Sequence, residues 1–242
     1  MKIGFFSDVH ANLEALTAVL ENARSEKVDK LFFLGDAVGY GPNPNECVEL
    51  ICANASACLM GNHDYAALGM LDTSSFNRYA KEAIDFTQAV LTKQNRNCLM
   101  EFEREYLFED FHMVHSTPTK PNQWDYIITL DDAEQNFPTL KRRIGLIGHS
   151  HFPAIVCKAN GSFPVLVRSD SIKIEKDQQF IINIGSVGQP RDNNPDSCYM
   201  LYDSPSNMAR LKRVKYDIKI TQDKMRKAGL SEYLINRLEK GR

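Results

Sequence analysis

The sequence lacks the long apolar stretches that membrane proteins carry. No hydrophobic run approaches the ~20 residues that a helix needs to cross a bilayer. The N-terminal stretch "KIGFFSD" is strand-like, and it has neither the apolar helical segment nor the small-residue cleavage site of a signal peptide. We therefore expect a cytoplasmic protein that is not attached to a membrane.

Cysteine pairs with the spacing of metal ligands are also missing. None of the six cysteines belongs to a Cys-x-x-Cys motif, and most lie among apolar residues: Cys47, Cys52, Cys58, Cys98, Cys157 and Cys198. We interpret them as reduced and buried, rather than as disulfides or thiolate ligands of a metal.

The chain has little excess of charge of one sign. Its net charge of −2 argues against a dedicated nucleic-acid-binding protein, which would neutralise phosphates with lysine and arginine. The charge is uneven, because the segment from Leu211 to the end has ten lysines and arginines but only four acidic residues. This pattern is typical of a solvated amphipathic helix; a docking surface for an acidic partner is the alternative.

The composition that remains is that of an ordinary globular domain. With 242 residues, 43% hydrophobic and 25% charged, the chain is expected to form one domain over residues 1–242. Within it, residues 217–242 are expected to form a C-terminal helical tail, with two short helices broken at Gly229.

The first half of the chain alternates strands with helices. Strands are predicted over residues 2–8, 30–36 and 56–62, and helices from Leu13, over 45–55 and, opened by capping serines, over 74–92. This order implies parallel strands covered by helices.

The second half is rich in short strands. They are predicted over residues 104–110, 111–117, 143–150, 154–159, 163–168, 180–186 and 198–205, with one helix near 130–137. We expect a second sheet of mixed or antiparallel strands packed on the first, and hence an α/β protein.

Polar side chains of metal-ligand type stand where the hydrophobic strands end. These are Asp8, His10, Asp36, Asn62, His63, Asp64, His115, His149 and His151. The carboxyl ends of strands in α/β sheets form a natural binding crevice, so these groups are expected to meet at one edge. Carboxylates and imidazoles without thiolates are ligands for Mn, Fe, Co or Zn. Since the candidates are too many for one ion, they predict two ions that share a carboxylate.

The motifs "SDVH", "GDAVGYGPNP", "GNHD", "VHSTP" and "GHSH", in this order, closely resemble those of the calcineurin-like metallophosphoesterases. Within that superfamily the chain is similar to small bacterial and archaeal members of phosphodiesterase type, which also have a motif like "NIGSVGQPRD". The resemblance implies a four-layer αββα sandwich of two packed mixed β-sheets flanked by helices.

The resemblance also implies two divalent metal ions, with Mn favoured over Fe, Zn or Co. Asp8, His10 and His151 would bind one ion and Asp36 would bridge both. Asn62, His115 and His149 would bind the second ion.

The implied reaction is the hydrolysis of a phosphoester, preferably a phosphodiester, by a hydroxide that bridges the metals. His63 would protonate the leaving oxygen or stabilise charge in the transition state. Asp64 would hydrogen-bond the His63 imidazole, unless it caps a turn. The expected partner is a small phosphoester or a nucleotide. Alternatives are a phosphomonoesterase or phosphoprotein phosphatase, a dinucleoside polyphosphate hydrolase, and a protein-binding scaffold.

Three further residues are candidates for substrate binding. Asn12 is either a helix cap or a polar contact near the phosphate. Tyr40 is expected to line the pocket, and Arg191 either pairs with a substrate phosphate or forms an ion pair with a nearby aspartate. We interpret His112 as structural. Trp124 and Tyr126 either stack on an aromatic group of the substrate or anchor their loop.

Overall fold

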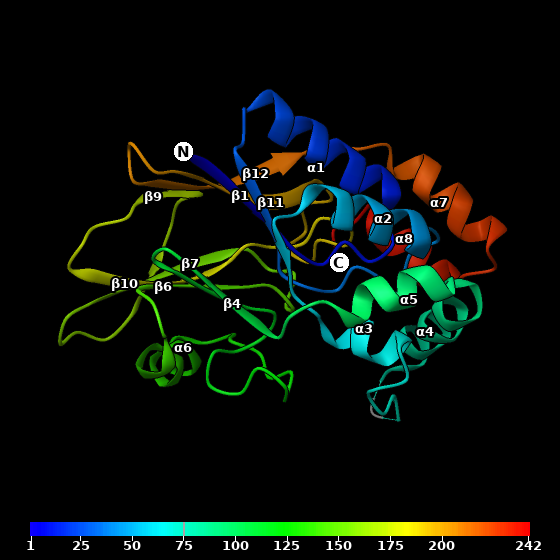
Figure 1. The fold of residues 1–242 in the computed structure, drawn as a ribbon, viewed down its shortest axis with the longest axis horizontal. Helices are drawn as coiled ribbons and strands as arrows, with labels where there is room; N and C mark the ends of the chain where they lie inside the picture. Colours follow the sequence, from blue (N-terminus) through cyan, green and yellow to red (C-terminus); the bar gives the residue numbers. More distant parts are fainter. Residues whose placement is uncertain (75) are drawn as a thin grey trace.

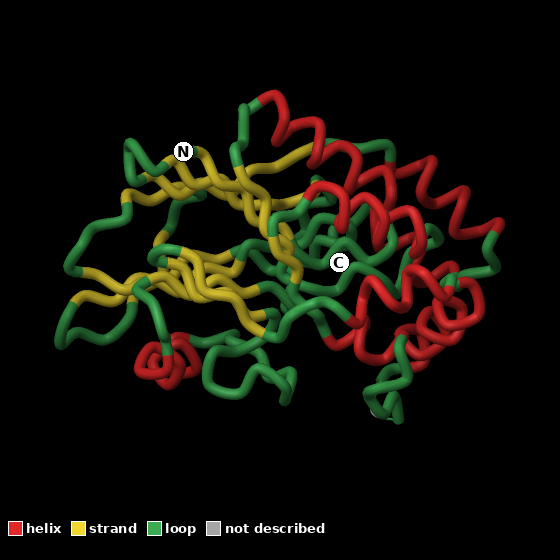
Figure 2. The backbone as a smooth tube through the Cα atoms, in the orientation of Figure 1, coloured by secondary structure: helices red, strands yellow, loops and turns green. Residues whose placement is uncertain are grey.

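The computed structural model describes residues 1–74 and 76–242. Two six-stranded sheets pack face to face, and helices cover their outer faces (Figure 1, Figure 2). The predicted four-layer αββα sandwich is therefore confirmed.

The first sheet contains the N-terminal strand. Its order is β3 (Ala57–Cys58), β2 (Lys30–Phe33), β1 (Lys2–Phe6), β11 (Ser197–Asp203), β12 (Met208–Val214) and β9 (Ser171–Lys173). β1, β2 and β3 are parallel, as the alternation of strands and helices predicted. The assignment of residues 198–205 to the second sheet is wrong, because β11 pairs with β1 antiparallel. β11 is buried along almost its whole length, so its pattern does not indicate which sheet it joins.

The second sheet is mixed, as predicted. Its order is β4 (Glu105–Phe108), β5 (Phe111–Val114), β6 (Ile144–Ile147), β10 (Gln178–Asn183), β7 (Ala154–Ala159) and β8 (Val165–Val167). β6 runs parallel to both β5 and β10, and the other pairs are antiparallel. The carboxyl ends of β5 and β6 therefore open at the same edge.

Helices lie on both outer faces and at one end of the sandwich (Figure 1). They are α1 (Leu13–Ser25), α2 (Pro44–Asn54), α3 (Asn62–Ala67), α4 (Arg78–Val90), α5 (Lys93–Met100), α6 (Leu130–Asn136), the 3-10 helix η1 (Phe137–Thr139), α7 (Ile218–Lys227) and α8 (Glu232–Leu238). Apolar residues of α1 and α2 pack on the first sheet, while α6 and η1 pack on the second (Figure 1).

The layer between the sheets is a hydrophobic core. The Phe5 ring centroid lies 5.5 Å from that of Phe32 on the same sheet and 4.8 Å from that of Phe111 on the other. Burial of each such side chain contributes about 1.5–3 kcal/mol. These contacts hold the two sheets together and so fix the strand ends of one against those of the other.

Several helix boundaries differ from the predictions. The strand expected over residues 56–62 ends at Cys58, and the chain turns into α3 at Asn62. The helix expected over 74–92 begins at Arg78, and the Asn77 side chain caps it; Ser75 lies outside the described residues. α5, β9 and β12 were not predicted. The tail does form two helices separated at Gly229, whose φ is +74°.

One cysteine pair contradicts the expectation of six reduced thiols. Cys52 of α2 and Cys98 of α5 form a disulfide. The two residues are 46 positions apart, but α2 and α5 pack against each other, which the linear sequence does not reveal. Cys47, Cys157 and Cys198 are buried free thiols, as expected.

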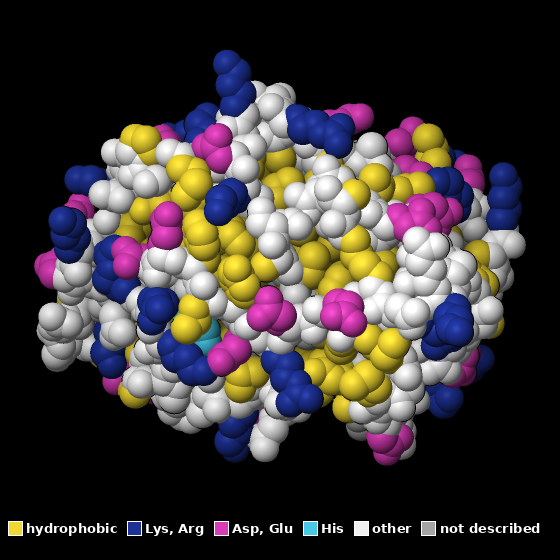
Figure 3. Space-filling view, viewed as in Figure 1, with side chains coloured by type: hydrophobic (Ala, Val, Ile, Leu, Met, Phe, Trp, Pro, Cys, Tyr) yellow, Lys and Arg dark blue, Asp and Glu magenta, His cyan; other side chains and the backbone are white. Residues whose placement is uncertain are grey.

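The basic tail has many acidic neighbours. Lys219 lies 2.6 Å from Asp223, Arg226 lies 3.0 Å from Glu232, and Lys224 pairs with Glu14 of α1. Figure 3 shows basic and acidic side chains close together over the region of α7. This arrangement favours a solvated helix face. Among the described residues, the helices are too short or too polar to span a bilayer.

Candidate metal centre

The carboxyl ends of four strands from both sheets meet at one site. Asp8 and His10 follow β1, Asp36 follows β2, His115 follows β5, and the "GHSH" segment follows β6. Hydrogen bonds join these loops: between the sheets, the backbone N–H of His149 donates to Asp8 Oδ2 at 3.1 Å, and within the second sheet, the Gly148 N–H donates to the His115 carbonyl at 2.9 Å. The convergence expected from the strand ends is thus present.

Asp8, His10 and His151 form the first group of potential ligands. Their donor atoms lie within 4.8 Å of one another. The distance from His151 Nε2 is 3.2 Å to Asp8 Oδ1 and 3.0 Å to His10 Nε2. One carboxylate and two imidazoles thus point at a common centre that could hold a divalent ion.

Asp36, His115 and His149 form the second group, also within 4.8 Å. His115 Nε2 lies 3.3 Å from Asp36 Oδ2, and the same oxygen lies 3.6 Å from His10 Nε2 in the first group. Asp36 therefore stands between the two groups, where a carboxylate shared by two ions would lie. The other oxygen of Asp36, Oδ1, accepts a hydrogen bond from the backbone N–H of His63 at 2.8 Å.

Backbone carbonyls orient the four imidazoles. The second nitrogen of each ring lies within hydrogen-bond distance of a carbonyl oxygen: His10 with Val38 (3.0 Å), His115 with Leu34 (2.8 Å), His151 with Gln189 (2.6 Å) and His149 with Trp124 (2.8 Å). Such bonds fix which nitrogen is free to bind a metal. The free nitrogen is Nε2 in three rings and Nδ1 in His149.

Several buried polar atoms at the centre have no hydrogen-bond partner among the described residues. They are Asp8 Oδ1, Asn62 Oδ1, His63 Nδ1 and His115 Nε2. An unsatisfied buried polar atom costs ~1–3 kcal/mol, so four at one place call for a ligand. Two divalent cations would satisfy the oxygens and the imidazole of His115, and the donor set fits Mn, Fe, Zn or Co.

The protonation of most of these groups suits metal binding; His115 is the exception, because the carboxylates of Asp36 and Asp8 outweigh burial and raise its pKa to about 9. Burial lowers the pKa of His149 to about 3, and it also lowers the pKa of His10 and His151. Although burial alone would raise the pKa of Asp8 and Asp36, nearby imidazoles outweigh it and hold both carboxyl pKa values below the ordinary range. Neutral imidazoles and ionised carboxylates are the forms that bind metals.

The backbone at the centre is strained. Twelve non-glycine residues among those described have a positive φ, and half of them are predicted site residues: Asp8, His10, Asp36, Tyr40, His149 and His151. This conformation costs ~1–3 kcal/mol per residue and persists where the surrounding structure enforces it, commonly at functional sites. The loops thus hold the side chains at geometries that an unconstrained chain would avoid.

Of the two roles considered for Asp64, the structure shows the second, a carboxylate that caps a turn. Its carboxylate accepts four backbone N–H groups, those of Asp36, Ala37, Val38 and Gly61, at 2.8–3.2 Å. The predicted bond to the His63 imidazole is therefore wrong. As the third residue of α3, Asp64 turns back toward the residue that precedes the helix and ties it to the Asp36 loop. It thus positions the loop.

The His63 ring lies beside the two groups. Its centroid is 4.9 Å from that of His10, 4.5 Å from that of Tyr40 and 5.3 Å from that of Phe76. Burial lowers the His63 pKa to about 4, although the Asp36 charge opposes this. The ring is therefore neutral near pH 7 and lies next to the centre.

The three substrate-binding candidates differ in their surroundings. Asn12 is the cap of α1: its Oδ1 accepts the Ala15 N–H at 3.2 Å and its Nδ2 donates to the Gly188 carbonyl at 2.8 Å, so its amide is occupied. Tyr40 packs against His63 and lies 4.8 Å from His10 between centroids. The expected alternative of an ion pair for Arg191 is not found among the described residues, because Asp192 pairs with Arg213 instead.

The loop after β5 supplies two aromatic residues to the site. The Tyr126 ring stacks on the His149 ring with centroids 4.2 Å apart and an angle of 11°. The Trp124 ring lies 5.3 Å from Tyr65 and 6.2 Å from His115, and its carbonyl holds His149. Trp124 is thus an anchor of the loop, whereas Tyr126 remains nearly half exposed beside a potential ligand.

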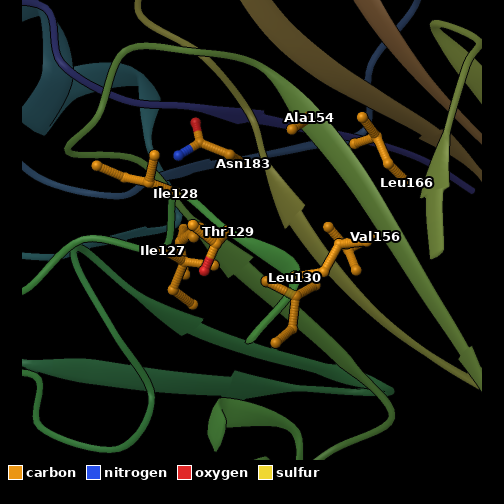
Figure 4. Close-up of a pocket in the computed structure, with 10 residues that line it drawn as sticks. Ile127, Ile128, Thr129, Leu130, Ala154, Val156, Leu166 and Asn183 are labelled. Carbon is orange, nitrogen blue, oxygen red and sulfur yellow. The ribbon is translucent and has the colours of Figure 1, made fainter. Parts of the chain in front are cut away.

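An apolar cavity of about 150 Å³ lies on the outer face of the second sheet (Figure 4). Ile128, Leu130, Val156 and Leu166 are among its lining residues, and they include no titratable side chain. The lining of this cavity therefore supplies no acid, base or charged metal ligand to the candidate centre.

Sequence reasoning did not identify two kinds of supporting residue. The carbonyls of Leu34, Val38 and Gln189 orient imidazoles, and any residue type could supply them. α8 packs into the cluster that contains Tyr40, and the guanidinium carbon of Arg237 in this helix lies 5.7 Å from the centroid of the Tyr233 ring. In the sequence, the excess of basic residues in the tail was the only signal that pointed to Arg237.

Known proteins resemble this chain over its full length. The family model for calcineurin-like phosphoesterases matches residues 1–172. An uncharacterised protein of Methanocaldococcus jannaschii is 37% identical over 246 residues, covering 99% of this chain and 98% of the relative. A metallophosphoesterase of Sphaerobacter thermophilus has a similar crystal structure, with a TM-score of 0.87 and 36% identity over 100% of this chain and 99% of that one. A hypothetical protein of Pyrococcus horikoshii OT3 shares the fold, with a TM-score of 0.81, 19% identity and coverage of 100% and 98%. The chain belongs to the calcineurin-like phosphoesterase family.

Proposed function

We propose that this chain is a phosphodiesterase that uses two divalent metal ions, preferably Mn²⁺, and acts in the cytoplasm. The observation that carries the proposal is the arrangement of two adjacent ligand groups around Asp36, with buried donor atoms that lack partners. Asp8, His10 and His151 would hold one ion, and Asn62, His115 and His149 the other. The preference for diesters rests on the resemblance of the motifs to the phosphodiesterase-type branch of the family.

When bound, two such ions lower the pKa of a water molecule and neutralise charge on phosphoryl oxygens. Asp36 would keep the two ion sites adjacent. Arg191 is half-buried with its guanidinium carbon 5.8 Å from the centroid of the Tyr40 ring, and its guanidinium could bind a phosphate oxygen. The strained loops fix these positions before the substrate binds, which favours reaction by pre-organisation.

His63 would act on the leaving oxygen. Because burial lowers its pKa to about 4, the neutral imidazole would donate a hydrogen bond from a ring N–H to the developing negative charge. Of the two roles predicted from the sequence, this one agrees better with the surroundings of the ring than the release of a full proton. Asp64 would support it indirectly, since it fixes the turn from which His63 projects.

The test compares substrates and variants on protein reloaded with Mn²⁺. Bis-p-nitrophenyl phosphate should be hydrolysed faster than p-nitrophenyl phosphate or a phosphopeptide; a faster monoester or phosphopeptide reaction would favour the phosphatase alternatives. An absence of bound metal and of activity would favour a protein-binding scaffold.

His63→Ala should lower turnover by roughly 10²–10⁴-fold while the protein keeps its metal. Metal content measured by mass spectrometry provides the control. Loss of metal from this variant would show that His63, rather than Asn62, is the ligand.

A further inference from the structure

A polar cavity of about 350 Å³ lies between the loop that follows β5 and helix α6. All of its lining residues fall between positions 117 and 136 of the chain. Figure 1 shows this loop beside α6, on the outer side of the second sheet. Sites for small molecules commonly have volumes of roughly 300–1,000 Å³, so the cavity is large enough for one group of a ligand.

The cavity adjoins the second group of potential metal ligands. Thr117, which lines it, is buried and lies two positions after His115. Tyr126 also lines it, and the ring of Tyr126 stacks on that of His149 with centroids 4.2 Å apart. Because Tyr126 is still 47% exposed, a molecule bound at the centre could extend past this ring into the cavity.

Hydrogen bonds fix the wall of the cavity on the side of α6. The backbone N–H and the hydroxyl of Thr119 both donate to Asn136 Oδ1, at 3.1 and 2.8 Å. Asp132 Oδ2 accepts the backbone N–H groups of Ile128 and Thr129 at 3.0 and 2.8 Å. The loop is thus fastened to the helix, and the cavity is formed before a ligand binds.

Other lining side chains have no hydrogen-bond partner among the described residues. They include the Asp125 carboxylate, the Lys120 ammonium, the Gln135 amide and the Thr117 hydroxyl. These groups offer both donors and acceptors to a ligand. The lining contains one lysine and two aspartates, so its formal charge is −1 (one minus two). Because like charges repel, this lining disfavours a second phosphate and favours a neutral, hydroxyl-rich group.

We propose that the cavity binds a vicinal diol of the substrate, such as that of a ribose or of a glycerol group, with Asp125 as the acceptor of its hydroxyls. The inference rests on the proposed function, because the phosphodiester to be cleaved would occupy the metal centre. A carboxylate has two acceptor oxygens, and one commonly binds the hydroxyls of a ribose in nucleotide sites. The Tyr126 ring would contact the apolar part of the same group.

The kinetic test uses the p-nitrophenyl esters of uridine 5′-phosphate and 2′-deoxyuridine 5′-phosphate, which share the reacting bond and differ by one hydroxyl. The wild type should cleave the uridine ester with a kcat/KM about 10-fold higher or more, as expected for a hydrogen bond to a charged group. Asp125→Ala should bring this ratio to near one, and Asp125→Asn should keep part of it. Equal rates for the two esters with the wild type would overturn the proposal.

A matched control is available on α6. Asp131 is as exposed as Asp125 by class and does not line the cavity, so Asp131→Ala removes the same charge and should keep the wild-type ratio. Loss of the ratio in this variant would overturn the role of Asp125.

A second pair of esters separates the two sources of the diol. The p-nitrophenyl ester of glycerol 3-phosphate is compared with that of 3-hydroxypropyl phosphate, which lacks the middle hydroxyl. A preference confined to the uridine pair assigns the diol to ribose, whereas a similar preference in both pairs assigns it to a diol of either kind.

A binding measurement separates this proposal from the proposed function. Calorimetry on the Mn²⁺-loaded His63→Ala protein should show tighter binding of uridine 5′-monophosphate than of 2′-deoxyuridine 5′-monophosphate, by about 10-fold. The additional change Asp125→Ala should abolish the difference. Equal binding, or binding of neither nucleotide, would overturn the diol site even if bis-p-nitrophenyl phosphate is hydrolysed. A preference that depends on Asp125 would support the site even if hydrolysis fails.

Discussion

His112 lies near the start of strand β5 and His115 directly follows the end of this strand. Both are buried, but their ring nitrogens differ in their partners. His112 Nε2 lies 3.3 Å from Glu105 Oε2, and its Nδ1 accepts the Lys141 N–H at 3.3 Å. His115 has one partner, the Leu34 carbonyl, and its Nε2 is without a hydrogen bond. A buried histidine by itself therefore does not indicate a site, whereas one with an unsatisfied nitrogen does.

The charges around the two histidines differ in the same way. At the His112 end, Glu105 pairs with Lys141, and Arg143 lies 2.6 Å from Asp110, so acidic groups have basic partners. Burial lowers the pKa of His112. At the other end, burial would also lower the pKa of His115, but the carboxylates of Asp36 and Asp8 outweigh it and raise the value to about 9. The surplus of negative charge at this end is what a divalent cation would neutralise.

Replacing the central carboxylate should have the largest effect. Asp36→Asn removes the charge shared by both ligand groups, so we expect loss of bound metal and a fall in activity beyond the ~10–100-fold typical of an outer-shell partner. The amount of bound metal and the rate of diester hydrolysis test these two expectations. Asp110→Asn at the opposite end removes one exposed ion pair worth ~1 kcal/mol or less, and it should keep metal and activity. If both variants keep their metal, the inference that only the His115 end of β5 needs a cation is wrong.

A pair of glycines tests the crowding at the centre. Gly39 has a φ of +86°, and a Cβ there would lie 2.5 Å from His63 Nδ1; Gly69 has a φ of +73° and open space around it. Alanine at either position incurs a similar backbone cost of ~1–2 kcal/mol. Only Gly39→Ala should displace His63, and a displacement of about 1 Å can lower turnover by ~10²-fold.

Diester hydrolysis and thermal unfolding of Gly39→Ala and Gly69→Ala separate these effects. Both variants should lose similar stability, but only the first should lose much activity. An equal loss of activity in the two variants would show that the position of His63 does not limit the reaction.

The convergence of the candidate ligands was predictable because each of them follows a hydrophobic strand, and strand ends of an α/β fold converge. Asp8, Asp36 and His115 are all of this kind. Their side-chain chemistry already indicated the class of ion. The helices around the site were less predictable: α3 begins within the predicted strand end, because Asp64 gains four backbone N–H donors by turning back.

Contacts between distant segments were not predictable from local patterns. Three features depend on how the layers pack: the pairing of β11 with β1, the disulfide between Cys52 and Cys98, and the packing of α8 against Tyr40. Periodicity indicates which face of an element is buried, but it does not identify the element that buries it. The sequence was therefore sufficient to predict that the candidate ligands converge, but not to predict the surroundings of the site.

The smallest expected effect concerns stability at the His112 end. Because burial lowers the pKa of His112 below its ordinary value of 6.5, the unfolded chain binds more protons than the folded protein as the pH falls below about 6.5. His112 should therefore destabilise the fold progressively in acid. His112→Gln lacks this titration, so its loss of Tm relative to the wild type should be larger at pH 7.5 than at pH 5, with a change of no more than about 2–4 °C. Taking the difference between the two proteins at each pH cancels the titration of the candidate metal ligands, which both share. A constant difference would mean that His112 keeps the same protonation in the folded and unfolded states, and that the contrast with His115 lies in hydrogen bonding alone.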